Sequence, residues 1–212
     1  MAFAVVFLGA FLGCSSKPGV KELRQSRDAV RAANSWEVYA TLGATTATVF
    51  QAKVECPSRR DMMWTVRPPA NLVMDNNGRV VVHDIWFDGD WYTSDGRLWN
   101  HFPGAEKALP GKLALGCGVG PALVWDGTLF SDLDAVIKTG EIRPGPTSTI
   151  NGGECTWWDV VPDKGAEARY TVCVDSVTHL PRVARTREHG TEYTYTLTRW
   201  NETSVALPPE LM

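Results

Sequence analysis

Alternation of apolar and polar side chains predicts strands over most of the chain after residue 35. In residues 48–56, Phe50, Ala52 and Val54 alternate with polar side chains, which is typical of a strand with one buried face. The same reasoning places further strands at residues 35–42, 61–66, 79–87, 89–93, 94–99, 182–186 and 191–200. Asn-Gly and Asp-Gly pairs between several of these segments favour tight hairpins.

Two segments have helical spacing instead. In residues 17–34, Val20, Leu23 and Val30 predict one modest helix after a polar tether. A second apolar series predicts a helix that Thr128 or Ser131 caps and that Gly140 ends. This series is Leu129, Phe130, Leu133, Val136 and Ile137. Residues 121–125 add a turn before it, and the Gly-rich residues 104–121 form the connection from the preceding strands.

These elements define an α+β fold, a curved antiparallel sheet of about 9–11 strands covered by two or three helices. The sheet curls because so few helices cannot cover its apolar face. We expect one domain over residues 35–212. A chain of 212 residues that is 44% hydrophobic can bury a real core. Its net charge of −3 gives no electrostatic footprint for nucleic acid, so no nucleic-acid partner is expected.

The first residues of the chain have the pattern of a targeting segment. Residues 2–12 are apolar and uncharged, and they are too short to span a bilayer. The sequence from Phe11 to Ser15 resembles the lipobox of bacterial lipoproteins, in which lipid is attached to a cysteine, here Cys14. The resemblance implies a signal peptide over residues 1–13, a tether and helix over 14–34, and membrane anchoring through acylated Cys14. Ser15 after this cysteine resembles lipoproteins that are sent on to the outer membrane, so we expect the chain on the periplasmic side of that membrane, with exposure at the cell surface as the alternative. The alternative is a short buried segment with a chance cysteine.

The other cysteines form an even set of four, which in an exported chain indicates disulfides with three possible connectivities. Residues 162–165 read as a turn, so a hairpin symmetric about Lys164 places Cys155 directly across from Cys173. Cys56 then pairs with Cys117 by elimination. A zinc site is the rival interpretation, but the chain has no Cys-x-x-Cys and we expect no metal.

Several motifs resemble the half-barrel lipoproteins related to the periplasmic carriers, the LolA/LolB-like and LppX/LprG-like family. They lie in residues 54–59, in the Trp-rich hairpin at 82–99 with Phe102-Pro103, and in residues 174–181 (VDSVTHLP). The resemblance spans about residues 36–210. It implies a curved sheet closed by helices around an apolar cavity that takes acyl chains.

Candidate cavity residues are the large side chains on the inferred apolar faces. They are Phe50, Val54, Trp64, Leu129, Phe130, Leu133, Trp158, Tyr170, Tyr193 and Tyr195. The competing interpretation is that these side chains fill a core, which is the usual role of strand aromatics. Trp86, Trp91 and Trp99 cluster in the Trp-rich hairpin and are equally compatible with an exposed rim.

No catalytic motif is present, and the chain calls for no cofactor. Asp88, Asp90 and Asp95 read as turn formers rather than calcium ligands. The four histidines have no partner at motif spacing. We therefore expect a lipid- or lipoprotein-binding module, with an envelope sensor or protein-interaction domain as the alternative and an enzyme as a third hypothesis. The ligand and the oligomeric state stay open.

Overall fold

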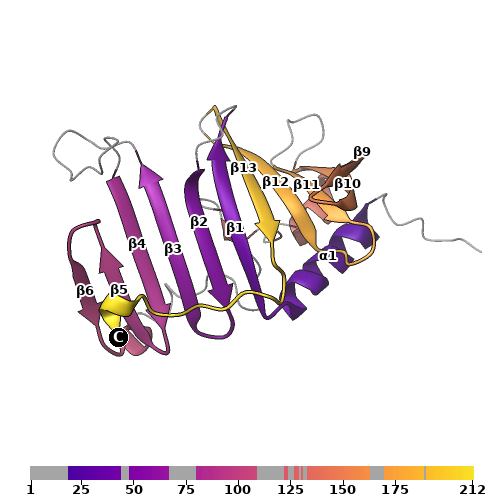
Figure 1. Cartoon of the computed structure of the whole chain (residues 1–212). Helices are drawn as coiled ribbons and strands as arrows, with labels where there is room; N and C mark the ends of the chain where they lie inside the picture. The colour runs from indigo at the N-terminus through magenta and orange to yellow at the C-terminus, as the bar shows by residue number, and fades with distance from the viewer. Residues whose placement is uncertain are drawn as a thin grey trace, which may run out of the picture.

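Eleven antiparallel strands form one curved sheet in the computed structural model (Figure 1). The structure describes residues 19–43, 48–66, 80–108, 122–123, 127–128, 130, 133–162, 170–188 and 190–212. The sheet contains β1 (Ser35–Leu42), β2 (Thr48–Glu55), β3 (Arg59–Val66), β4 (Val80–Phe87), β5 (Asp90–Ser94), β6 (Trp99–Phe102), β9 (Glu141–Ile150), β10 (Gly153–Val161), β11 (Tyr170–Asp175), β12 (Pro181–Glu188) and β13 (Thr191–Thr198). The remaining elements are α1 (Val20–Ala32), α2 (Ala105–Ala108), β7 (Ala122–Leu123), β8 (Gly127–Thr128), α3 (Leu133–Thr139) and the 3-10 helix η1 (Pro209–Leu211). The α+β half-barrel is thus confirmed.

The sheet consists of two meanders that meet at its centre. Its strand order is β6-β5-β4-β3-β2-β1-β13-β12-β11-β10-β9, so every neighbouring pair is consecutive in sequence except β1 and β13. Val38 lies opposite Leu197 in this central pair, and Ala40 lies opposite Tyr195. All four side chains are buried, which means that the seam is also part of the core.

One face of the sheet carries the main core. Val38, Phe50 and Tyr195 point to this side, which we call the inner face, and the opposite side is the outer face. Helix α1 contributes Val20, Leu23 and Val30 to the same core, and α3 contributes Leu133 and Val136. The helix predicted from Val20, Leu23 and Val30 is therefore confirmed, and it packs on the sheet rather than extending from it.

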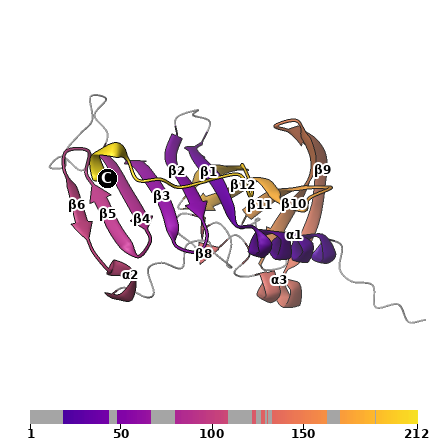
Figure 2. The same ribbon diagram turned by 60° about the horizontal axis from the view of Figure 1, so that its bottom comes forward.

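The chain leaves the sheet at one edge, β6, and re-enters it at the other edge, β9. The elements described in this interval are α2, beside β6, then the β7–β8 pair, and then α3 near β9 (Figure 2). Ala105 and Phe130 from this interval are both buried in the inner-face core. Both described helices of seven residues or more, α1 and α3, contact the β9–β13 half of the sheet.

Helix α1 begins in direct contact with the sheet. Gly19 precedes it with φ of 80°, a left-handed conformation that glycine adopts without strain. A Cβ at this position would lie 2.6 Å from both Ile142 Cγ2 and Trp158 Cε3. Glycine therefore lets the first turn of the helix approach β9 and β10 closely.

The C-terminal segment packs on the outer face. It runs across β1, β2, β3 and β4 toward β5 (Figure 1). The Thr203 amide donates to Ser35 Oγ at 3.0 Å, and the Val205 amide donates to Glu55 Oε2 at 2.8 Å. Glu37 lies on the same face of β1 as Ser35 and is only 4% exposed. Its carboxylate accepts hydrogen bonds from the Tyr39 hydroxyl and from Arg199 Nη1.

One strand was missed by the alternation pattern. Strand β9 contains Pro144, Gly145 and Pro146, residues that mark turns in most contexts. It forms an edge of the sheet. Proline has no backbone N–H, and at an edge it is tolerated because an N–H that points away from the sheet would have no neighbouring strand to bond.

The predicted second helix begins later than its apolar series indicated. Residues 127–128 form the short strand β8 and α3 begins at Leu133, while Phe130 is buried ahead of the helix and Leu129 lies outside the described residues. Residues 122–123 form strand β7 rather than the expected turn. Ala122 lies opposite Thr128 in the β7–β8 pair, so Thr128, one of the two expected cap residues, lies in a strand.

The disulfide between Cys155 and Cys173 is confirmed, but the predicted register is wrong by two residues. Cys155 lies opposite Asp175, and Cys173 lies opposite Trp157, so the bond joins diagonal neighbours with Cα atoms 5.4 Å apart. The faces are as expected, because a shift of two preserves alternation. In the observed register Asp159 lies opposite Thr171, and its carboxylate accepts a hydrogen bond from Thr171 Oγ1 at 2.8 Å.

Cys56 also forms a disulfide, with a partner outside the described residues. Cys117 and Cys14 both lie in that part of the chain. The pairing of Cys56 with Cys117 thus stays a prediction, as does lipid attachment at Cys14.

Candidate functional site

The candidate site is the inner face of the β1–β6 meander. It carries a stack of three aromatic rings contributed by β4, β5 and β6. The ring centroids of Trp86 and Trp91 lie 5.4 Å apart, and those of Trp91 and Phe102 lie 4.8 Å apart. Exposure rises along the stack, since Trp86 is 7% exposed and Phe102 is 44% exposed. The stack leads from the core to the edge of the sheet.

Two further aromatic pairs line the same face. Phe50 on β2 packs against Trp64 on β3, with centroids 5.3 Å apart. Tyr193 and Tyr195 lie two residues apart on β13, with ring centroids 6.4 Å apart. Trp64 and Tyr193 are half-buried, whereas Phe50 and Tyr195 are buried. The face therefore combines a packed base with side chains that keep accessible apolar surface.

Most of the predicted cavity residues belong to the inner-face core, but they are spread over both halves of the sheet and its covering elements rather than confined to β1–β6. Those that lie in the inner-face core, or pack against it, are Phe50, Trp64, Phe130, Leu133, Trp158, Tyr170, Tyr193 and Tyr195. Val54 packs instead in a smaller cluster with Ala33 and Trp36. Near the end of β2 the inner face is thus already filled by Trp36, which is fully buried, and Val54 is not a lining residue of the same site.

Two polar side chains on the inner face were not among the sequence candidates. Arg60 lies in phase with Met62 and Trp64 on β3, and it is only 3% exposed. Asp84 accepts a hydrogen bond from Trp91 Nε1 at 3.1 Å, which fixes the orientation of the middle ring in the stack. The sequence could have indicated both residues, because each is a polar side chain at a strand position where alternation predicts an apolar one.

The three tryptophans of the Trp-rich hairpin lie on both faces. Trp86 and Trp91 belong to the inner-face stack. Trp99 lies on the outer face, where its ring centroid is 4.9 Å from that of His83. His83 Nε2 lies 2.6 Å from Asp61 Oδ1 on the outer face. The hairpin is therefore neither a uniform rim nor a uniform core.

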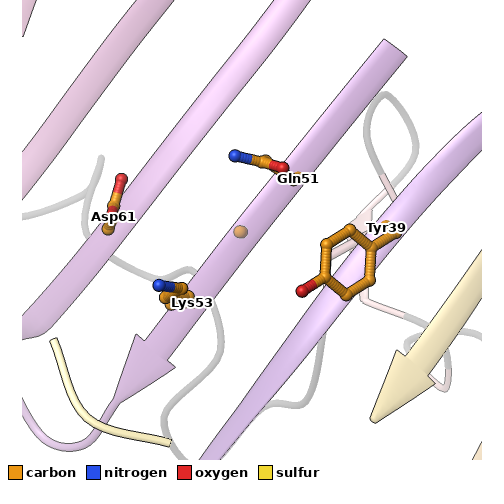
Figure 3. Close-up of a pocket in the computed structure, with 5 residues that line it drawn as sticks. Tyr39, Gln51, Lys53 and Asp61 are labelled. Atoms are coloured by element: carbon orange, nitrogen blue, oxygen red, sulfur yellow. The ribbon is translucent and has the colours of Figure 1, made fainter. Parts of the chain in front are cut away.

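A pocket of about 220 Å³ on the outer face is lined by Tyr39, Gln51, Ala52, Lys53 and Asp61 (Figure 3). The Tyr39 hydroxyl donates to Glu37 at 2.7 Å, and this hydrogen bond, together with burial, raises the pKa of Tyr39. The polar lining is unsuited to an acyl chain. The inner face is thus the better candidate for an apolar ligand.

The family-like sequence motifs are explained by turn geometry. Asp88 and Gly89 both have positive φ in the β4–β5 turn, and Arg59 binds the Asp88 carboxylate at 2.8 and 3.0 Å. The side-chain hydrogen bond from Arg59 lowers the pKa of Asp88. Asp90 accepts a hydrogen bond from the Gly104 amide at 2.8 Å, and Asp95 accepts one from the Arg97 amide at 3.1 Å. The interpretation of these aspartates as turn formers is confirmed.

The VDSVTHLP segment builds the turn between β11 and β12. Asp175 Oδ1 accepts hydrogen bonds from the Val177 and Thr178 amides at 2.9 and 2.7 Å. Its Oδ2 accepts from Arg182 Nε at 2.7 Å, and Arg182 Nη1 reaches the Ile150 carbonyl at 3.0 Å. Burial opposes ionisation of Asp175, but these donors outweigh it and lower its pKa to about 2.

No helix in the described part of the chain is both long enough and apolar enough to cross a bilayer. Within the same residues, His, Cys, Asp and Glu side chains nowhere gather in a group of three or more that would suit a metal ion.

Comparison with known structures identifies the fold. The chain is similar to LprF from Mycobacterium bovis, with 14% identity, a TM-score of 0.56, and coverage of 90% of this chain and 96% of that one. It is also similar to the lipoprotein LppX of Mycobacterium tuberculosis, with 15% identity, a TM-score of 0.53, and coverage of 88% and 96%. The chain thus has an LppX-like half-barrel fold, as the sequence motifs predicted. No protein-family model matches the sequence, and a search of curated proteins finds no relative.

Proposed function

We propose that this chain is a bacterial envelope lipoprotein whose half-barrel binds a lipid, an acyl chain or a lipoprotein on its inner face, as a carrier or binding protein. The observation that carries the proposal is the aromatic inner face of β1–β6. Phe102 is 44% exposed at the end of its stack, and Trp64 and Trp91 are half-buried. A concave face with accessible apolar side chains favours an apolar ligand.

The fold supports the same conclusion. LppX, which shares it, is itself described as a lipoprotein. Among the described residues, the inner face carries few polar side chains, with Arg60 and Asp84 near the aromatic stack. This arrangement suits an apolar chain that is held mainly by contact area rather than by hydrogen bonds.

Trp64→Glu is expected to weaken uptake of a fluorescent fatty acid by roughly tenfold or more, because it places a carboxylate on the apolar face. The matched control is Met63→Glu, which introduces the same charge one residue away on the outer face. Binding is measured by fluorescence titration of the chain from Ser15 onward, and thermal melts of both variants verify folding.

Native mass spectrometry of the same protein should show mass added by a co-purified apolar ligand. The bare protein mass, together with no fatty-acid uptake, would contradict the proposal. That outcome, combined with capture of a defined protein partner, would favour the interaction or sensor domain instead.

The anchor is a separate part of the proposal. It comprises a signal peptide over residues 1–13, acylation of Cys14, and a tether leading to α1, with the protein held at the outer membrane on its periplasmic side. Cys14→Ala should move the full chain from the detergent phase to the aqueous phase in a phase-partition assay, because two or three acyl chains are lost. Unchanged partitioning would refute lipidation without affecting the ligand-binding proposal.

A further inference from the structure

The two edges of the large sheet differ in how they are protected. Strand β9 carries Pro144 and Pro146 together with Glu141 and Arg143, and proline and charge are the usual means of blocking an edge. Strand β6 at the opposite edge, Trp99–Phe102, contains neither proline nor a formally charged side chain. In the described part of the chain, no strand pairs with its outer side.

The hydrogen-bonding groups that β6 presents outward follow from the hairpins. The two-residue Asp88-Gly89 turn makes Phe87 and Asp90 a hydrogen-bonded pair, and such pairs alternate along the strands. Trp91 therefore directs its backbone groups toward Phe102 on β6, and Thr93 directs its groups toward Asn100. The backbone groups of Trp99 and His101 consequently point away from the sheet.

Side chains at this edge leave apolar surface uncovered. Phe102 stacks on Trp91 and so lies on the inner face, and alternation within β6 places Asn100 on the same side. Leu98 directly precedes β6, and extending the strand by one residue would place its side chain on this side as well. Leu98 is 76% exposed and Phe102 is 44% exposed, and they are two of the few large apolar side chains with this accessibility in the described residues.

We propose that β6 pairs with β6 of a second copy of this chain, antiparallel and centred on Asn100, so that two half-barrels form one continuous sheet. In this register Trp99 lies opposite His101 of the second copy, and the two exchange backbone hydrogen bonds. Phe102 lies opposite Leu98 of the second copy, which covers both exposed apolar side chains. No other register with a two-fold axis through this strand does so: centring on His101 places Phe102 opposite Asn100.

The charge pattern permits self-pairing. Residues 98–102 bear no formal charge, so no like charges face one another across the two-fold axis. The carboxylate of Asp90, on the neighbouring strand β5, is occupied by His101 Nε2 at 2.9 Å and by the Gly104 amide. The paired sheet would extend the Trp86–Trp91–Phe102 stack to Leu98 of the second copy and join the two inner faces.

The test uses Asn100→Cys in the full chain. In the proposed dimer Asn100 lies opposite Asn100 of the second copy at a non-hydrogen-bonded position. Cα atoms at such positions lie about 4.5 Å apart, within the range of a disulfide. Mild oxidation in intact cells should give a dimer on a non-reducing gel that reductant removes. Thr149→Cys is the matched control, because Thr149 is also exposed and lies on the opposite edge strand; this variant should stay monomeric.

A cysteine-independent variant tests the register. Leu98→Asp alters a side chain that is 76% exposed, so folding should be unaffected, but it sets a carboxylate against Phe102 of the second copy. We expect the dissociation constant of the dimer, measured by light scattering of the full chain in mild detergent, to rise roughly tenfold. An unchanged constant would overturn the register.

Cross-linking of Asn100→Cys no faster than that of Thr149→Cys would overturn the dimer itself. So would a cross-linked product whose mass identifies a different protein. Neither readout involves the ligand, so the outcome is independent of the proposed binding function.

Discussion

Asp175→Asn is expected to lower the free energy of unfolding at neutral pH by about 2–3 kcal/mol. Asparagine can still accept the amide hydrogen bonds of Val177 and Thr178, but its own amide group then faces the Arg182 guanidinium, so two donors meet where a charge-assisted bond stood. Chemical denaturation of both proteins measures the difference. Asp95→Asn is the control, since this exposed turn residue accepts one hydrogen bond from Arg97.

The same variant should show a defined pH dependence. Because the pKa of Asp175 in the folded protein is about 2, below its unfolded value of about 3.9, the ionised carboxylate stabilises the fold fully above about pH 4. This stabilisation is lost as the pH falls through about 2. The difference between wild type and Asp175→Asn should therefore shrink toward zero on acidification. A difference that stays constant with pH would attribute the effect to packing rather than to charge.

Removing the Cys155–Cys173 bond by replacing both residues with alanine is expected to cost about 3 kcal/mol. The bond closes a loop with a sequence separation of 18, and its loss enlarges the conformational freedom of the unfolded chain. Both cysteines are fully buried beside Trp157 and Val183, so the variant also loses some packing. Thermal and denaturant unfolding of the oxidised proteins should show the difference.

A Cys56→Ala background isolates this bond, because Cys56 is the other described cysteine in a disulfide. In that background, reductant should destabilise the chain with Cys155 and Cys173 intact and leave the double alanine variant unchanged. Equal sensitivity to reductant in both proteins would show that the 155–173 bond does not contribute.

Local patterns were sufficient wherever one face of an element is buried and its neighbours in sequence are also neighbours in space. Strand β1 begins and ends where the pattern placed it, and α1 buries the three apolar residues that predicted it. The hairpin register could not be read from the cysteines, because alternation fixes the face of each residue but not a shift of two along the partner strand. Strand β9 was hidden by prolines that only an edge position accommodates.

The candidate site was predictable in composition but not in extent. Phe50, Trp64, Tyr193 and Tyr195 reach the inner face because strand alternation sends them there. Val54 shares that alternation and still falls outside the site, because the fully buried Trp36 on β1 occupies the space beside it. The stack of Trp86, Trp91 and Phe102 depends on cross-strand pairing between β4, β5 and β6, which no single segment reveals.

The seam between β1 and β13 has a consequence for how the sheet assembles. Each meander pairs strands that follow one another along the chain, and such local pairings form quickly. The seam instead joins residues 37–42 to residues 193–198, so it cannot form until the chain has been synthesised as far as β13. Until β13 is present, β1 and β12 lack the strand that lies between them in the sheet. Strand β13 therefore joins the two meanders into one sheet.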